Sequence, residues 1–156
     1  MRARKREKYI LDIEELYDKI YRYCYYRLHN RELAEDITQE TFLRWFASDT
    51  YRDRNQTLQY LYTIARNLCI DEARRIKPEP FNETLQVSNN DPDPLSSIAL
   101  QTALRSLNEQ DRELVLLRCV NRESMGVLCR VYGQSRFTLY RRLRNILNKL
   151  RNELKE

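Results

Sequence analysis

Residues 124–152 read SMGVLCRVYGQSRFTLYRRLRNILNKLRN, and this stretch decides how the second half of the chain folds. It holds seven Arg and Lys residues and no Asp or Glu. Apolar residues recur in it at helical spacing on both sides of Gly133, so it predicts two helices joined at that glycine. Helices this one-sided in charge repel themselves unless a polyanion lies opposite, and the DNA backbone is the commonest such partner.

The same stretch meets the requirements of a helix-turn-helix. That motif needs a small residue where the helices touch, a turn residue that tolerates positive φ, and an apolar anchor on the second helix. Cys129, Gly133 and Leu139 fit these roles, and Ser135 can cap the second helix, whose first turn then points at a DNA groove. The alternative is a solvated basic face on a helical hairpin. The positions expected to contact DNA are Ser135, Arg136, Phe137, Thr138, Tyr140, Arg141, Arg142 and Arg144.

Composition points to a helical protein without a metal or a membrane span. The 156 residues include only 2 Gly and 4 Pro, which argues against a turn-rich β-sandwich or barrel. No apolar run approaches the roughly 18 residues of a membrane helix, and no signal-peptide core follows the basic start, so we expect a cytoplasmic protein without membrane insertion. The four cysteines are far apart and there is one histidine, which predicts reduced, mostly buried thiols, no metal site and no cofactor.

An acidic, proline-rich segment divides the chain. Residues 78–95 hold all four prolines and four acidic residues but no basic one. Because proline removes helix donors and pushes its predecessor to extended geometry, this segment predicts a linker. We therefore expect an all-α fold of two small helical domains, 9–77 and 96–156.

Hydrophobic spacing places the helices within each half. In the first half, His29-Asn30 should separate a first helix from a second over 31–46, with Leu33, Ile37, Thr41 and Trp45 inward. A polar loop over 48–57 should precede a third helix over 58–76. The second half should contain helices over 95–107, 109–120 (capped by Asn108), 124–131 and 135–154. The five tyrosines between Tyr17 and Tyr26 either lie at the edge of the core or form a partner surface.

Three segments carry a resemblance to a known family. They are AEDITQETF (34–42), YLYTIARNLCIDEARR (60–75) and LNEQDRE (107–113), which precedes the helix-turn-helix. Their order resembles the extracytoplasmic-function (ECF) sigma factors, the small bacterial initiation subunits that contain only sigma domains 2 and 4. The chain departs from the family pattern at Tyr60, which replaces a tryptophan, over 121–129, and at Arg136-Phe137, which replaces a pair of small residues.

The resemblance implies two partners and their contact residues. The core polymerase-binding face on the β′ clamp helices would consist of Asp36, Gln39, Glu40 and Leu43. The −10 DNA element would be read, with one base flipped into a pocket, by Tyr51, Arg52, Asn55, Gln56, Arg66, Asn67, Asp71, Arg74 and Arg75. The helix-turn-helix would read the −35 element, the polymerase β flap would bind the second domain, and an anti-sigma factor would hold the chain inactive.

Each assignment has a structural alternative. The acidic face of the second helix also fits an ordinary solvated surface, and Asn67 and Asp71 also fit a capping or helix-helix hydrogen bond. A sigma factor has no catalytic centre of its own, so we expect no enzyme. The rival functions are a sigma-like regulator that does not support initiation, a helical adaptor, and a recombinase. The helical first half argues against the recombinase, which needs a strand-rich catalytic domain.

Overall fold

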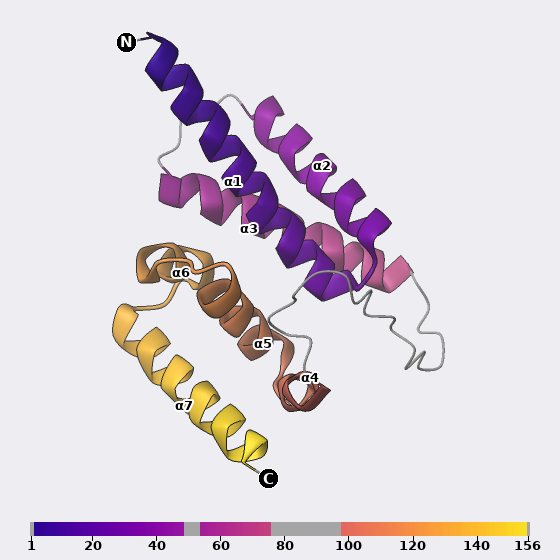
Figure 1. The fold of residues 1–156 in the computed structure, drawn as a ribbon, viewed down its shortest axis with the longest axis vertical. Coiled ribbons are helices and arrows are strands. Elements are labelled where there is room, and N and C mark those ends of the chain that lie inside the picture. The colour runs from indigo at the N-terminus through magenta and orange to yellow at the C-terminus, as the bar shows by residue number, and fades with distance from the viewer. Residues whose placement is uncertain (1, 49–53, 76–97, 156) are drawn as a thin grey trace. The chain divides into compact units, whose positions relative to one another are not determined.

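The computed structural model describes residues 2–48, 54–75 and 98–155, with side chains from residue 12 onward (Figure 1). Every regular element among these residues is a helix, so the chain is all-α. It divides into two compact units, Met1–Pro80 and Phe81–Glu156. The expected linker, 78–95, lies outside the described residues. None of the described helices combines the length and the apolar character that crossing a membrane requires.

The first unit is built from three helices that each pack on the other two: α1 (Arg2–Leu28), α2 (Arg31–Ala47) and α3 (Arg54–Arg75). The corner between α1 and α2 forms where expected. His29 takes φ 52°, in the left-handed region, and the Asn30 side chain accepts a 3.1 Å hydrogen bond from the Leu33 amide. This satisfies one of the amides that a helix start leaves without an intrahelical partner.

The buried face of α2 is rotated slightly from the expected one. Ile37 and Thr41 are buried as predicted, but Leu33 and Trp45 are only half-buried. The small residues Ala34 and Thr38 face the core instead. The hydroxyls of the two threonines donate to the carbonyls of Ala34 and Ile37 at 2.6 and 2.7 Å. Because these polar groups are satisfied within the helix, they can be buried at close approach to the neighbouring helices.

Helix α3 begins earlier than the polar pattern suggests. A loop was expected through Thr57, but residues 54–57 are helical. No Gly or Pro interrupts this segment, and Thr57 is buried. The Arg54 guanidinium forms ion pairs with Glu15 at 2.7 Å and Asp12 at 3.6 Å, both on α1. These contacts with a distant segment hold the first turn, which is why local polarity alone misplaces it.

The tyrosines of α1 divide between the core and its edge. Tyr23 is fully buried, and its ring centroid lies 5.6 Å from that of Tyr62 on α3. Tyr21 and Tyr25 are half-buried, with ring centroids 6.4 Å apart. Tyr17 lies against Phe42 of α2 at 5.4 Å, and burial, together with the Glu35 carboxylate, raises its pKa. Most of these tyrosines therefore pack at the edge of the core of the unit.

The second unit contains α4 (Ile98–Arg105), α5 (Glu109–Val115), the π-helical turn η1 (Leu116–Val120), α6 (Met125–Tyr132) and α7 (Arg136–Leu154). Asn108 caps α5 as expected, accepting from the Asp111 amide at 2.8 Å. The expected continuous helix over 109–120 changes to π geometry at Leu116. The first expected helix already ends at Arg105, and its remaining start, 95–97, lies outside the described residues.

The cysteines follow the expectation in part. Cys24 and Cys69 are buried, and a hydrogen bond with the Cys69 thiol lowers the pKa of the Cys24 thiol although burial opposes it. Cys129 is half-buried, whereas Cys119 is exposed, which corrects the prediction for that residue. The π turn that carries Cys119 places its thiol on the surface of the unit. All four are free thiols, and the described residues contain no cluster of metal-ligating side chains.

Gly133 supplies the first testable prediction. Its φ of 62° is strained for any residue with a Cβ, although a Cβ at this position would meet no atom within 4 Å. We expect Gly133→Ala to lower the local stability of α6 and α7 by about 1 kcal/mol, through backbone strain alone. Hydrogen exchange of the amides in the two helices measures this. Gly133→Asn is the matched control and should cost less, since asparagine tolerates left-handed geometry; equal losses would contradict the explanation.

Candidate nucleic-acid interface

The turn between α6 and α7 has the geometry that a helix-turn-helix requires. Gly133 ends α6 in left-handed geometry, with φ 62° and ψ 33°. Ser135 then caps α7 by accepting from the Thr138 amide at 3.2 Å, while its hydroxyl donates to the Thr138 hydroxyl at 3.0 Å. Leu139 anchors α7 and is fully buried, as is Leu128 of α6. Ser135 and Thr138, both expected to contact DNA, are thus already engaged in the cap.

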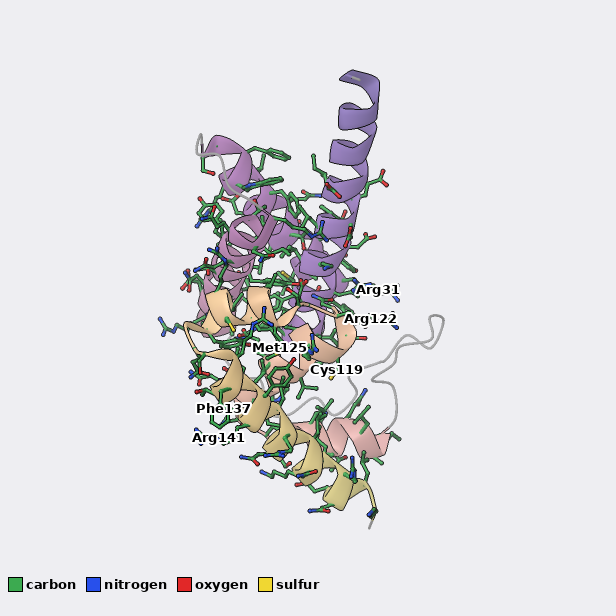
Figure 2. The ribbon with its side chains drawn as sticks, turned by 90° about the vertical axis from the view of Figure 1, so that its left-hand side faces the viewer. Arg31, Cys119, Arg122, Met125, Phe137 and Arg141 are labelled. Carbon is green, nitrogen blue, oxygen red and sulfur yellow. The ribbon has the colours of Figure 1, made fainter. Side chains whose placement is uncertain are left out.

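The first two turns of α7 present a basic and aromatic surface. Phe137 is 74% exposed and Tyr140 53% exposed. The Arg141 guanidinium lies 5.5 Å from the centre of the Phe137 ring, and Figure 2 shows these two side chains together on one side of α7. Among the described residues, no carboxylate pairs with Arg136, Arg141 or Arg144, which are all exposed. We define the recognition surface as Arg136, Phe137, Tyr140, Arg141 and Arg144.

Arg142 is an exception to the expected exposure. Its side chain is only 21% exposed and pairs with Asp111 of α5 at 3.0 Å. It also donates to the Gln134 side chain at 2.9 Å, and its guanidinium lies 5.6 Å from the centre of the Tyr132 ring. The Tyr132 hydroxyl in turn donates to the buried Glu113 carboxylate at 2.7 Å. The interactions of Arg142 thus connect α7 to α5 and to the turn.

The residues expected to read melted DNA are divided along α3. At about 100° per residue, Gln56, Asn67, Asp71 and Arg74 lie on the face opposite the buried one. Asn55 and Arg66 flank the core and are half-buried. Gln56 lies about 16 Å along the axis from Asn67, at a rise of 1.5 Å per residue. Asn67, Asp71 and Arg74 therefore lie together on the C-terminal half of α3, whereas Gln56 lies near its N-terminus.

Two further details concern this part of α3. Arg75 approaches Glu72 at 3.9 Å and not its i−4 neighbour Asp71. Asn67 and Asp71 are both exposed, so neither lies in a buried contact between helices. Tyr51 and Arg52 lie outside the described residues. The grouped residues offer amide, carboxylate and guanidinium groups, which suit hydrogen bonding to unpaired base edges.

Helix α2 presents an acidic surface, in contrast to the basic recognition surface of α7. All four residues expected to bind polymerase are exposed and share one side of the helix: Asp36, Gln39, Glu40 and Leu43. Arg44 pairs with Glu40 at 3.1 Å, with both side chains exposed, while Leu43 remains 63% exposed. Phe46, which the sequence reasoning missed, continues this side and is 55% exposed. Phe46 could have been found from the sequence, because a residue three positions after Leu43 lies on the same side of a helix. The surface is acidic toward one end and apolar toward the other.

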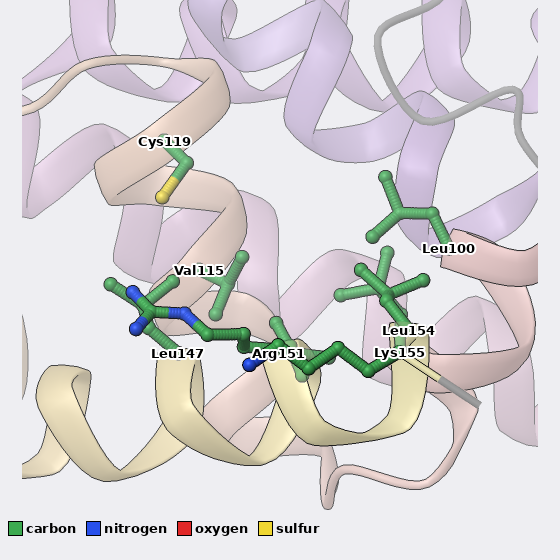
Figure 3. A pocket seen from close by; sticks show the side chains of 9 residues that line it. Leu100, Val115, Cys119, Leu147, Arg151, Leu154 and Lys155 are labelled. Carbon is green, nitrogen blue, oxygen red and sulfur yellow. The ribbon is translucent and has the colours of Figure 1, made fainter.

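A second feature missed from the sequence is an apolar groove in the second unit. It measures about 530 Å³ and lies between α4, the α5–η1 segment and α7 (Figure 3). Leu147 and Leu154 line it and are partly exposed, and Arg151 and Lys155 lie at its edge. Cys119 also borders the groove; although the residue is exposed, the neighbouring side chains partly desolvate its thiol and raise the pKa of the thiol. Leu147 and Leu154 lie outside the buried apolar stripe of α7. Their position off that stripe was the signal in the sequence that could have indicated an exposed apolar surface.

Comparison with known proteins agrees with this geometry. Residues 13–78 match the family model described as Sigma-70 region 2. The chain is 37% identical over 131 residues to the ECF RNA polymerase sigma factor BldN of Streptomyces coelicolor, covering 76% of this chain and 49% of BldN. It is 44% identical over 72 residues to the ECF RNA polymerase sigma factor SigW of Bacillus subtilis, covering 45% of this chain and 38% of SigW. The chain thus spans half the length of these relatives or less.

A solved structure shares the fold. It is the sigma factor RpoE from Bartonella quintana, crystallised in complex with the anti-sigma factor NepR. The TM-score is 0.67 at 20% sequence identity, covering 96% of this chain and 98% of that chain. At this identity the likeness concerns the fold, and the helical arrangement described above is therefore one that sigma factors adopt.

The Asp111–Arg142 pair gives a prediction about stability. Because the pair is hydrogen-bonded and half-buried, we expect a coupling energy of about 1 kcal/mol in a double-mutant cycle of Asp111→Asn and Arg142→Gln. Urea denaturation of the four proteins measures it. The matched control is the cycle of Glu40→Gln and Arg44→Gln, an exposed pair on α2 that should couple by about 0.5 kcal/mol or less. Equal coupling in the two cycles would mean that Arg142 does not hold α7 in place.

Proposed function

We propose that this chain is a bacterial RNA polymerase sigma factor of the ECF kind, which binds core RNA polymerase and directs transcription initiation at particular promoters. The carrying observation is a Sigma-70 region 2 match in the first unit combined with a basic, exposed recognition surface on a helix-turn-helix in the second. In this proposal residues 9–77 form sigma domain 2, 78–95 the linker and 96–156 sigma domain 4. Sigma factors are generally regulators without enzymatic activity, and polymerisation belongs to the core enzyme.

The acidic surface of α2 suits docking on the β′ clamp helices of the polymerase. Asp36 and Glu40 supply charge, and Leu43 and Phe46 supply exposed apolar area at the same side of one rigid helix. Interfaces of this kind combine an apolar centre with a charged rim. The apolar groove of the second unit is the corresponding surface for the β flap. An anti-sigma factor, the partner of the RpoE neighbour, would act by covering these surfaces in the cytoplasm.

The α3 surface suits the −10 element. Asn67 and Asp71 offer hydrogen-bonding groups to exposed base edges, and Arg74 and Arg75 supply charge for the backbone. We also place Arg66, Asn55 and Gln56 in this contact, together with Tyr51 and Arg52 from the segment before α3. The recognition surface of α7 suits the −35 element, which remains duplex, because arginine contacts both guanine edges and phosphates there.

Run-off transcription with purified core polymerase on a genomic promoter library tests the proposal. We expect the chain to produce transcripts from a defined subset of promoters, which core enzyme alone does not produce. DNA binding without transcripts would instead identify a sigma-like regulator. Absence of both polymerase binding and DNA binding would overturn the proposal and favour a helical adaptor.

Polymerase binding should depend on the acidic side of α2. We expect the double variant Asp36→Arg, Gln39→Ala to bind core polymerase at least about tenfold more weakly, because like charges then oppose each other at the interface. Both residues are exposed, so the buried face of α2 is preserved. Co-elution with core enzyme measures binding, and circular dichroism checks helicity. Glu14→Arg, an equal charge reversal on exposed α1, should bind normally; unchanged binding by the double variant would refute the docking assignment.

The two promoter elements should be affected separately. Arg141→Ala should impair use of the −35 element, and Asn67→Ala should impair −10 reading, each by roughly 1–3 kcal/mol per lost base contact. Transcription from promoters with point changes in each element measures the two effects. On a template already melted at −10, Arg141→Ala should discriminate bases normally and Asn67→Ala poorly. The opposite pattern would reverse the assignment of the two surfaces.

A further inference from the structure

Phe137 lies outside the core of its unit. Its side chain is 74% exposed in the first turn of α7, whereas the helix is anchored by the fully buried Leu139. The ring does have a defined neighbour, the Arg141 guanidinium one turn later at 5.5 Å. A cation over an aromatic face at this distance is an attractive contact. Phe137 is therefore held on the surface, beside a charged group, and Figure 2 shows both side chains on the outside of α7.

The surroundings of the ring indicate what it contacts. Residues 124–152 contain no carboxylate, and Arg136 and Arg141 are exposed next to Phe137. A polyanion satisfies these charges. On the floor of the DNA major groove, base edges display hydrogen-bond donors and acceptors and a single kind of apolar group, the C5-methyl of thymine. A phenyl ring that enters this groove with its cationic neighbours thus has one favourable contact available.

The anchoring of α7 determines which side chains enter the groove. The N-terminal residues of a recognition helix contact base edges. Ser135 and Thr138 are used in the cap, and Arg142 is held by Asp111 and the Tyr132 ring. Phe137 and Arg141 remain available near the start of the helix. Phe137 is thus the apolar side chain of the first turn that is placed to meet a base.

We propose that Phe137 is a specificity-determining residue that contacts the C5-methyl group of one thymine in the −35 element. The inference rests on the proposed function, since it presumes that α7 reads promoter DNA. Arg141 acts as a positioning residue for the ring as well as a contact to DNA.

The test removes the methyl group alone. The probe is the duplex promoter most strongly transcribed by the holoenzyme in the run-off assay, with single thymines of its −35 element replaced by deoxyuridine. At one thymine, we expect the unmodified holoenzyme to bind about fourfold more weakly after replacement, the factor for ~0.8 kcal/mol per buried methyl group. Phe137→Ala holoenzyme should bind the thymine duplex about fourfold more weakly and should not distinguish thymine from deoxyuridine there.

Four further proteins make the outcome specific. Phe137→Leu keeps an apolar contact and should retain part of the thymine preference. Tyr140→Ala removes the other exposed ring of the recognition surface; it should weaken overall DNA binding but leave the ratio of thymine to deoxyuridine affinity at that position unchanged. Arg141→Lys keeps a cation near the ring and should preserve the preference better than Arg141→Gln, a difference that a purely phosphate-binding arginine would not produce.

The possible results separate the inference from the proposed function. A holoenzyme that transcribes specifically but shows no deoxyuridine penalty in the −35 element, or a strongest promoter without thymine there, overturns the inference and leaves the sigma-factor function intact. Equal thymine preference in Phe137→Ala and the unmodified chain also overturns it. Weaker polymerase binding by Phe137→Ala with an unchanged preference would assign the ring to a protein contact. A chain that forms no initiating complex overturns both.

Discussion

The contact between Arg142 and Asp111 sets the orientation on which the second unit's recognition surface depends. The leucine stripe of α7 supplies burial, but apolar packing alone specifies the rotation of a helix loosely. The 3.0 Å ion pair and the hydrogen bond to Gln134 restrict the rotation of α7 about its axis, because they fix one side of the helix relative to α5 and to the turn. Since pairs of this kind contribute little net stability, we interpret the contact as a device for orientation.

A consequence is a division of labour among neighbouring cations. Arg141 and Arg142 are adjacent in sequence and equal in chemistry, yet about 100° of helix rotation turns one toward the surface and the other toward α5. Helix α2 of the first unit also has a buried side and a charged, exposed side, but there the exposed charges are negative. It buries Ala34 and Thr38 and exposes Asp36 and Glu40. Each unit therefore combines a satisfied inner face with a charged outer one, and the signs suit a protein partner for α2 and DNA for α7.

The features that could be predicted from the sequence are those governed by local hydrogen bonds. The breaks at His29-Asn30 and Gly133 and the caps at Asn108 and Ser135 depend on residues within one turn, so short patterns reveal them. The start of α3 and the role of Arg142 could not be predicted this way. They depend on Glu15, 39 residues from Arg54, and on Asp111, 31 residues from Arg142. The groove likewise requires three segments that meet only in the folded unit.

This distinction between local and distant constraints also shows which positions of α7 can vary. On α7, Leu139, Leu143 and Arg142 have partners inside the unit, so a change at any of them alters the fold or its orientation. Arg136, Phe137, Tyr140 and Arg141 are exposed and can change at little cost in stability. The departure of this chain from the family pattern at Arg136-Phe137 falls in the second group. Substitutions at these positions can therefore change the recognition surface while the helix-turn-helix that carries it remains the same.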